Sequence, residues 1–132
     1  MVLDACINQS PSKRVLVVED EPAVMRFVVI QLNSLGYETK TASTLKEALA
    51  RLDQERFDLL FTDIALPKGE GGLELAEWVQ ATQPSMPVLL TSGYPPQSVA
   101  LRGAAGPLPL LRKPYKRTEL KTALAQTLAH RA

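Results

Sequence analysis

The chain has 132 residues, of which 45% are hydrophobic and 22% are charged, and this size and composition are typical of one globular domain. Fifteen basic and fourteen acidic residues give a formal net charge of +1, so the overall charge gives no reason to expect a nucleic-acid or membrane surface. The single cysteine, Cys6, cannot form an internal disulfide, and no apolar run approaches the roughly 18 residues of a membrane span. Since a signal-peptide pattern is also missing, these features predict a cytoplasmic protein.

The first 13 residues are polar and show no periodic pattern, so we expect a flexible N-terminal tail (1–13) before a single domain over residues 14–132. This domain begins with Val15–Val18, an apolar and mostly β-branched run that is typical of a strand buried on both faces. Three acidic residues, Glu19, Asp20 and Glu21, follow the run directly. The first strand is therefore predicted to end in a group of carboxylates.

A helix, a strand and a second helix are predicted next. Pro22 fits the first turn of the first helix, and Gly36 is suited to a left-handed cap at its end. Residues 37–42 predict a short strand, whose polarity indicates the edge of a sheet. Ser43 or Thr44 can then cap the second amphipathic helix.

The third strand is predicted at Phe57–Phe61, and it leads into Asp63. A glycine-containing loop follows over residues 67–72. Apolar residues over 73–79 recur at helical spacing, and Pro84 ends this helix.

Two more strands complete the pattern. Val88–Leu90 predicts a fourth strand that ends near Ser92, and Leu108–Leu111 predicts a fifth. The helix between them, around 97–101, is expected to be short because prolines and glycines crowd it. A closing amphipathic helix follows, with Thr118 as its expected cap.

Strands and helices that alternate five times predict an α/β fold, a doubly wound five-stranded parallel sheet between two layers of helices. Ligands of such sheets bind beyond the carboxyl ends of the strands, where the strand order reverses. The acidic residues 19–21, Asp63, Ser92 and Lys113 all follow predicted strands. We therefore expect these side chains to meet at one site.

Carboxylates crowded beside a lysine favour a site for Mg²⁺ and a phosphoryl group, since Mg²⁺ prefers oxygen ligands and often binds one or two carboxylates. Asp20 and Asp63 are the predicted metal ligands, Glu19 could bind directly or through water, and the backbone carbonyl of Ala65 could complete the set. Asp63 could also act as a nucleophile, and Lys113 could neutralise charge on a transferred phosphoryl group. Taken singly, these residues also have structural interpretations as helix-start acids, a turn-forming aspartate and a solvated lysine.

Four motifs, in this order and at these spacings, resemble the receiver domains of two-component response regulators across essentially all of residues 14–130. The motifs are Val15-Leu-Val-Val-Glu-Asp-Glu-Pro22, Leu60-Phe-Thr-Asp-Ile-Ala-Leu-Pro67, Pro87-Val-Leu-Leu-Thr-Ser-Gly93 and Leu110-Leu-Arg-Lys-Pro-Tyr115. The resemblance implies the CheY-like form of the fold, a flavodoxin-like (βα)5 three-layer sandwich.

The resemblance also implies a role for each site residue. Asp63 would accept a phosphoryl group from a sensor histidine kinase or a histidine phosphotransferase, with Mg²⁺ held by Asp20, Asp63 and the Ala65 carbonyl. Ser92 takes the place of the family's hydroxyl and Lys113 that of its lysine. A single-domain response regulator is implied, which is no enzyme, binds neither nucleic acid nor membrane directly, and could form a homodimer. Its fourth helix, fifth strand and fifth helix would contact a downstream protein.

Two positions depart from the family pattern. Members usually have Asp where Glu19 stands, and the longer side chain is expected to reach the metal through water. Members commonly carry an aromatic residue three positions before the lysine, where this chain has Leu110. In the family this aromatic residue acts as a rotamer switch. Tyr94, two residues after Ser92, could take over that role in this chain.

Three other functions compete with this one. An aspartate-nucleophile phosphatase would need a second acid two residues after Asp63, where the chain has Ala65. A flavin- or nucleotide-binding domain would need a phosphate-binding glycine motif after the first strand, which the sequence lacks. A degenerate receiver that binds partners without phosphorylation is compatible with the departures at Glu19 and Leu110.

Overall fold

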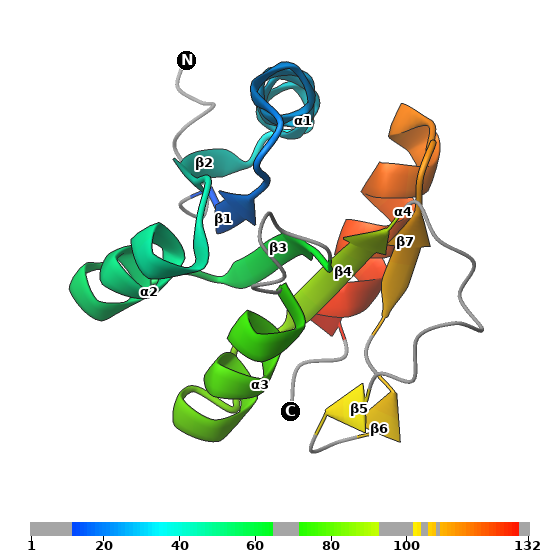
Figure 1. The fold of residues 1–132 in the computed structure, drawn as a ribbon. Coiled ribbons are helices and arrows are strands. Elements are labelled where there is room, and N and C mark those ends of the chain that lie inside the picture. Colours follow the sequence, from blue (N-terminus) through cyan, green and yellow to red (C-terminus); the bar gives the residue numbers. More distant parts are fainter. Residues whose placement is uncertain (1–11, 65–71, 93–101, 104–105, 108, 130–132) are drawn as a thin grey trace, which may run out of the picture.

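The structure is a computed structural model that describes residues 12–64, 72–92, 102–103, 106–107 and 109–129 (Figure 1). Five parallel strands form one sheet in the order β2-β1-β3-β4-β7. These strands are β1 (Arg14–Val18), β2 (Glu38–Ala42), β3 (Leu59–Asp63), β4 (Val88–Ser92) and β7 (Leu110–Arg112). The predicted five-stranded parallel sheet is confirmed, and the polar strand β2 lies at its edge as expected.

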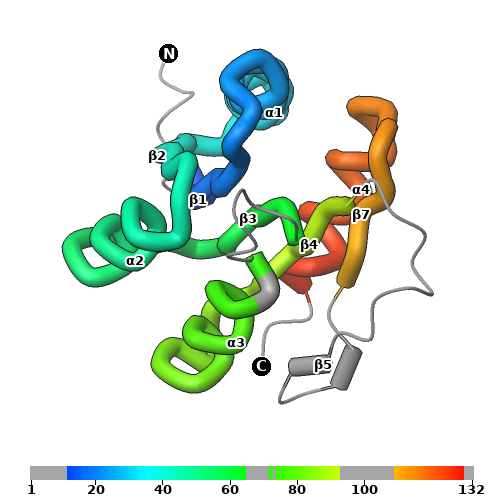
Figure 2. The backbone as a smooth tube through the Cα atoms, viewed as in Figure 1, coloured from blue at the N-terminus to red at the C-terminus, as the bar shows by residue number. Residues whose placement is uncertain are grey.

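Four helices in the described part of the chain cover the sheet on both faces. They are α1 (Pro22–Ser34), α2 (Leu45–Gln54), α3 (Gly72–Thr82) and α4 (Arg117–Ala129). Helices α1 and α4 lie over one face, and α2 and α3 lie over the other (Figures 1 and 2). The helix expected around 97–101 and most of the expected tail, residues 1–11, lie outside the described residues.

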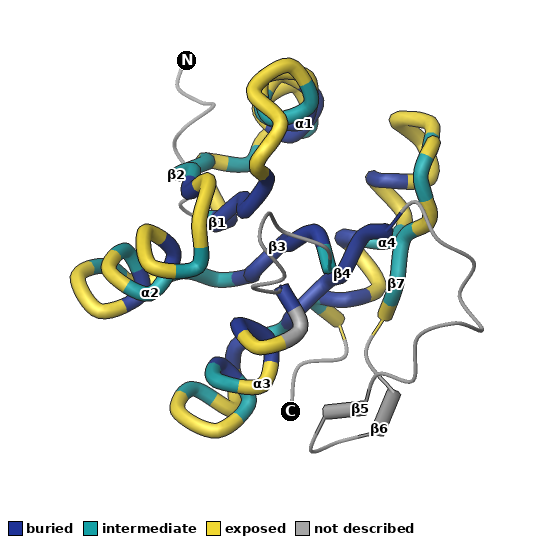
Figure 3. Tube along the Cα trace, in the orientation of Figure 1, coloured by how far each residue is buried: buried dark blue, intermediate teal, exposed yellow. Residues whose placement is uncertain are grey.

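The core has two layers because successive strand residues point to opposite faces of the sheet. One layer packs strand side chains under α2 and α3, and its strand members are Leu16, Val18, Ala42, Leu60, Val88 and Leu90. The other layer packs under α1 and α4, and its strand members are Val15, Val17, Leu59, Phe61 and Leu89. Figure 3 shows the central strands as continuously buried. This explains why these strands read as unbroken apolar runs.

The end of α1 depends on Gly36, whose φ of +95° is in the left-handed region. The Gly36 N–H donates to the Asn33 carbonyl at 3.0 Å, and the Tyr37 N–H donates to the Leu32 carbonyl at 3.0 Å. These two hydrogen bonds form a Schellman motif. The expected glycine cap is confirmed, and it turns the chain directly into β2.

Thr44 is the N-cap of α2, one of the two candidates that the sequence offered. Its hydroxyl accepts a hydrogen bond from the Glu47 N–H at 3.1 Å. In return, the Glu47 carboxylate accepts from the Ser43 N–H at 2.6 Å, so the segment forms a capping box.

The described structure also differs from the sequence-based prediction. Strand β3 begins at Leu59, two residues later than expected, and extends to Asp63. The cap prediction for Thr118 was wrong, because α4 begins at Arg117 and Thr118 lies inside its first turn. There the Glu119 carboxylate accepts a hydrogen bond from the Lys116 N–H at 2.7 Å.

A short antiparallel pair, β5 (Arg102–Gly103) and β6 (Gly106–Pro107), was not predicted. It lies beside the main sheet in Figure 1 and is not hydrogen-bonded into it. Within the described residues, no helix is both long and apolar enough to cross a membrane.

Candidate functional site

The site lies at the carboxyl edge of the sheet, where β1 and β3 are neighbours. The chain runs from β1 outward to β2 and then returns to the other side of β1 to form β3, so the strand order reverses between β1 and β3. Such a reversal leaves a crevice beyond the strand ends. Glu19 and Asp20 follow β1, and Asp63 is the last residue of β3.

Three carboxylates converge at these strand ends, as predicted. One oxygen from each of Glu19, Asp20 and Asp63 lies within 4.8 Å of the other two. Glu19 and Asp63 are only 5% and 7% exposed, whereas Asp20 is open to solvent. The group offers only oxygen atoms, which are the ligands that Mg²⁺ prefers.

Lys113 reaches this group from the segment that follows β7, the outermost strand on that side of the sheet. Its Nζ donates a hydrogen bond to Asp63 Oδ2 at 2.7 Å and to Glu19 Oε1 at 3.2 Å. The Lys113 backbone N–H donates to the Ser92 carbonyl at 2.8 Å, which fixes the segment after β7 against the end of β4. The ammonium therefore bridges carboxylates at the ends of two different strands, β1 and β3.

Burial and charge oppose one another within the group. Burial raises the pKa of Glu19, although hydrogen bonds from the Glu21 N–H and the charge of Lys113 act in the lowering direction. Burial would lower the pKa of Lys113, but the hydrogen bonds and negative charges of Asp63 and Glu19 outweigh it and raise that pKa. Lys113 therefore stays protonated at neutral pH.

Two hydroxyl residues end β4 beside Asp63. Thr91 is the register partner of Asp63 in β3, and Ser92 is the next residue. Both are buried, with Ser92 at 1% exposure. Alternation along the strand turns their side chains in opposite directions, so one hydroxyl at most faces the carboxylates in a regular strand.

The predicted residues Ala65 and Tyr94 lie outside the described residues. Leu110 is partly buried and packs into the core layer under α2 and α3. Among the described residues, Tyr115 is an aromatic residue near the site, and its ring lies edge-on to Phe61 at a centroid distance of 6.4 Å. Burial, helped by the charges of Glu19 and Asp63 and opposed by Lys113, raises the pKa of Tyr115 to about 12.

Sequence reasoning gave no role to Tyr115 or to Gly72. Gly72 is the first residue of α3, and its N–H donates to the Ile64 carbonyl at 3.0 Å. The pair of adjacent glycines at 71 and 72 was the available signal for Gly72. The signal for Tyr115 was its position two residues after Lys113.

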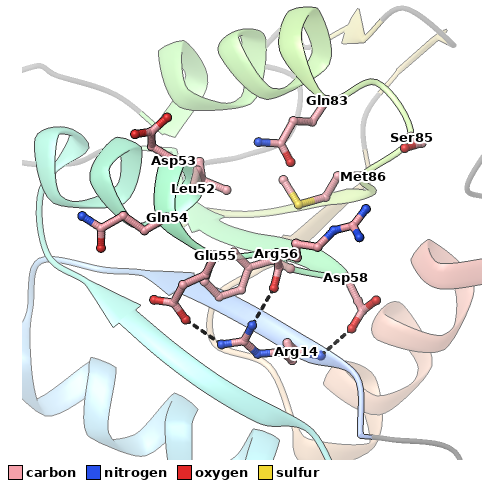
Figure 4. Close-up of a pocket in the computed structure, with 11 residues that line it drawn as sticks. Arg14, Leu52, Asp53, Gln54, Glu55, Arg56, Asp58, Gln83, Ser85 and Met86 are labelled. Atoms are coloured by element: carbon pink, nitrogen blue, oxygen red, sulfur yellow. Dashed lines mark hydrogen bonds and ion pairs between the residues drawn. The ribbon is translucent and has the colours of Figure 1, made fainter.

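A pocket lies at the other end of the strands, where β1, β3 and β4 begin (Figure 4). Arg14 lines this pocket and donates to Glu55 Oε1 at 2.6 Å and to the Arg56 carbonyl at 2.8 Å. The Arg14 N–H donates to Asp58 Oδ2 at 2.8 Å. These contacts tie the start of β1 to the segment between α2 and β3, far from the carboxylates.

Comparison with known proteins gives consistent results. The profile of the response regulator receiver domain family matches residues 15–125. The response regulator protein PilR of Pseudomonas aeruginosa is 33% identical over 117 residues, which cover 88% of this chain and 26% of PilR. The chain thus spans about a quarter of that relative's length. The response regulator receiver protein CpdR of Brucella abortus is 31% identical over 121 residues, which cover 88% of this chain and 97% of CpdR.

A solved structure supports the same assignment. The response regulator TrrA of Thermotoga maritima, crystallised in complex with Mg²⁺ and BeF, matches with a TM-score of 0.77 and 29% identity. The match covers 87% of this chain and 98% of TrrA.

Proposed function

Because this chain belongs to the response regulator receiver domain family, we propose that it is a phosphorylatable switch and that Asp63 is its phosphoryl acceptor. Receiver domains are signalling modules that interact with histidine kinases or phosphotransfer proteins and with downstream targets. The observation that carries the proposal is the position of Lys113, which bridges Asp63 and Glu19 inside a group of three carboxylates.

The proposed reaction is transfer from a phosphohistidine of the partner. A carboxylate oxygen of Asp63 forms a bond to phosphorus, and the bond between phosphorus and the imidazole nitrogen breaks. The electron pair of the broken bond stays on that nitrogen, which takes up a proton from solvent. The products are an aspartyl phosphate and a neutral histidine.

Glu19, Asp20 and Asp63 would hold Mg²⁺, and the Ala65 carbonyl remains a predicted fourth ligand. When bound, the cation neutralises charge on the phosphoryl oxygens. Lys113 supplies a second, fixed positive charge beside Asp63. Ser92 is the proposed hydroxyl contact of the phosphoryl group, since it is buried at the end of β4.

Phosphorylation would change the surface that the chain offers to partners. A phosphoryl group adds about −1.5 to −2 charge at neutral pH, and Lys113 lies between β7 and α4. We propose that a downstream protein contacts β7, α4 and the segment before β7. We propose no direct contact with nucleic acid or a membrane and no enzymatic activity on other substrates. Formation of a homodimer is compatible with this proposal.

A mass measurement tests this function. The protein is incubated with Mg²⁺ and a small acyl-phosphate donor, and its intact mass is followed. Wild type is expected to gain one phosphoryl group, and Asp63→Asn is expected to gain none. Asp53→Asn is the matched control, because Asp53 is exposed on α2 beside the Arg14 pocket.

The other outcomes discriminate between functions. An adduct on Asp63→Asn, or no adduct on wild type, would contradict the role of Asp63. The absence of an adduct on wild type would favour a module that binds partners without phosphorylation. Steady release of phosphate from simple monoesters would favour a phosphatase.

A further inference from the structure

Gly72 lies directly against the backbone of Asp63. A β-carbon at position 72 would overlap the carbonyl oxygen of Asp63, and it would lie 2.8 Å from the carbonyl carbon and 2.7 Å from Thr62 Oγ1. β-carbons in proteins do not come this close to backbone atoms. Only glycine therefore allows the start of α3 to approach the end of β3 in this way.

Hydrogen bonds hold this close approach on both sides of Asp63. The Gly72 N–H donates to the Ile64 carbonyl at 3.0 Å. The Thr62 hydroxyl donates to the Asp63 carbonyl at 3.1 Å. The backbone around Asp63 is thus tied to the first turn of α3 and to the preceding strand residue.

A side chain at position 72 would displace Asp63 more readily than it would displace α3. The helix is anchored by Leu75, Ala76 and Val79, each with 0% exposure. Asp63, in contrast, is the last residue of β3, where the pairing with β1 has already ended at Thr62 and only the pairing with Thr91 of β4 continues. Displacement of the helix would open a core of several packed apolar side chains, whereas a shift of Asp63 would be opposed by a single strand neighbour, Thr91.

We propose that Gly72 is a positioning residue that fixes the Asp63 carboxylate relative to Glu19 and Lys113. This proposal rests on the proposed function of Asp63. The hydrogen bond between Lys113 Nζ and Asp63 Oδ2 is 2.7 Å long, so a displacement of about 1 Å would break its geometry. Misplacement on that scale can slow a reaction on the order of a hundredfold.

Gly72→Ala tests the proposal, and Gly36→Ala is its matched control. Gly36 has a φ of +95° with no atom within 4 Å of a β-carbon, so alanine there strains the backbone without touching the site. Both variants are compared with wild type at a temperature where unfolding curves show that all three are folded. The measurements are Mg²⁺ affinity by titration calorimetry and the rate of phosphoryl adduct formation with an acyl-phosphate donor.

Gly72→Ala is expected to weaken Mg²⁺ binding and to slow adduct formation by roughly tenfold to a hundredfold. Gly36→Ala is expected to keep both wild-type values despite its lower stability. Wild-type values of both quantities in Gly72→Ala would overturn the proposal. Failure of wild type to form an adduct would instead contradict the role of Asp63, and Mg²⁺ affinity would still report the position of its carboxylate.

If Gly72→Ala does not fold, a second pair of variants tests whether the contacts of the Asp63 carbonyl position its carboxylate. Thr62→Val removes the hydroxyl that holds the same carbonyl oxygen, and Thr62→Ser keeps it. Thr62→Val is expected to slow adduct formation, and Thr62→Ser is expected to restore it. A wild-type rate in Thr62→Val would show that these backbone contacts serve only the fold.

Discussion

At the scale of single residues, Lys113 places a cation inside the carboxylate group. Its ammonium group lies 2.7 Å from Asp63 and 3.2 Å from Glu19, within the group of carboxylates that could hold a cation. Because Glu19 is almost fully buried, water screens this interaction poorly. Lys113 and Mg²⁺ would therefore compete for the same negative potential.

Lys113→Met is expected to bind Mg²⁺ more tightly than wild type while forming the phosphoryl adduct more slowly. The substitution removes the competing charge but retains the apolar stem. An increase in affinity of roughly tenfold, about 1.4 kcal/mol, is expected. Titration calorimetry checks the affinity, and intact mass checks the rate.

Lys116→Met provides the control, because Lys116 is exposed in the same segment and outside the carboxylate group. It should leave both quantities unchanged. Weaker Mg²⁺ binding in Lys113→Met would show that the ammonium organises the carboxylates rather than competing with the cation.

At the scale of elements, α2 depends on its first turn. Thr44→Ala removes the hydroxyl that accepts from the Glu47 N–H, and an unpaired N–H at a helix start destabilises the fold. We expect a loss of about 1 kcal/mol in the free energy of unfolding, measured by urea denaturation. Thr44→Ser retains the acceptor and should keep most of the stability. Equal losses in the two variants would show that packing, and not capping, is what Thr44 contributes.

The strands show how far sequence patterns predict elements here. Val15–Val18 and Val88–Leu90 were predicted from apolar runs, and both lie within observed strands. The apolar Phe57 predicts the start of β3, but Phe57 precedes the strand, and its ring lies under the Arg14 guanidinium at 5.2 Å from the centroid. At the other end, Asp63 joins the ladder opposite Thr91, since backbone pairing does not require an apolar side chain.

The same reasoning explains which parts of the site were predictable. Glu19, Asp63 and Lys113 could be brought together from sequence because parallel strands end at one edge, whatever their packing. Gly72 could not be assigned a role in this way, because its contact with Asp63 depends on how closely one helix approaches one strand. Tyr115 depends likewise on a contact with Phe61 across the core.

At the scale of the whole molecule, Arg14 connects elements at the edge opposite the site. It contacts Glu55 after α2, the Arg56 carbonyl and, at 3.6 Å, Glu38 of β2. The hydrogen bond from Arg14, with smaller contributions from Arg51 and Lys40, lowers the pKa of Glu55 below its usual value of 4.5. Ionised Glu55 is therefore favoured in the folded state.

This interaction makes global stability depend on pH. A lowered folded-state pKa adds stability that is fully present above the unfolded-state value near 4.5 and is lost as the pH falls through the folded-state pKa. Glu55→Gln should therefore be less stable than wild type at neutral pH, and the difference should shrink below about pH 4.5. Urea denaturation across this pH range measures the difference.

Glu77→Gln removes the same charge from the exposed side of α3 and provides the control. Glu77→Gln should lower the stability at neutral pH by less than Glu55→Gln does, because it removes no contact with Arg14. If the stability difference between Glu55→Gln and wild type stays constant from neutral to acidic pH, the hydrogen bond from Arg14 does not lower the pKa of Glu55.

The position of β2 and the shortness of β7 have a consequence for self-association. An open sheet has two unpaired borders, and each can template the addition of a foreign strand and growth into fibrils. Here one border carries the charged residues Glu38 and Lys40, and the other is only three residues long. Both outer strands, β2 and β7, thus disfavour the addition of further strands. The carboxylates take no part in this protection, because they meet at the ends of the inner strands β1 and β3.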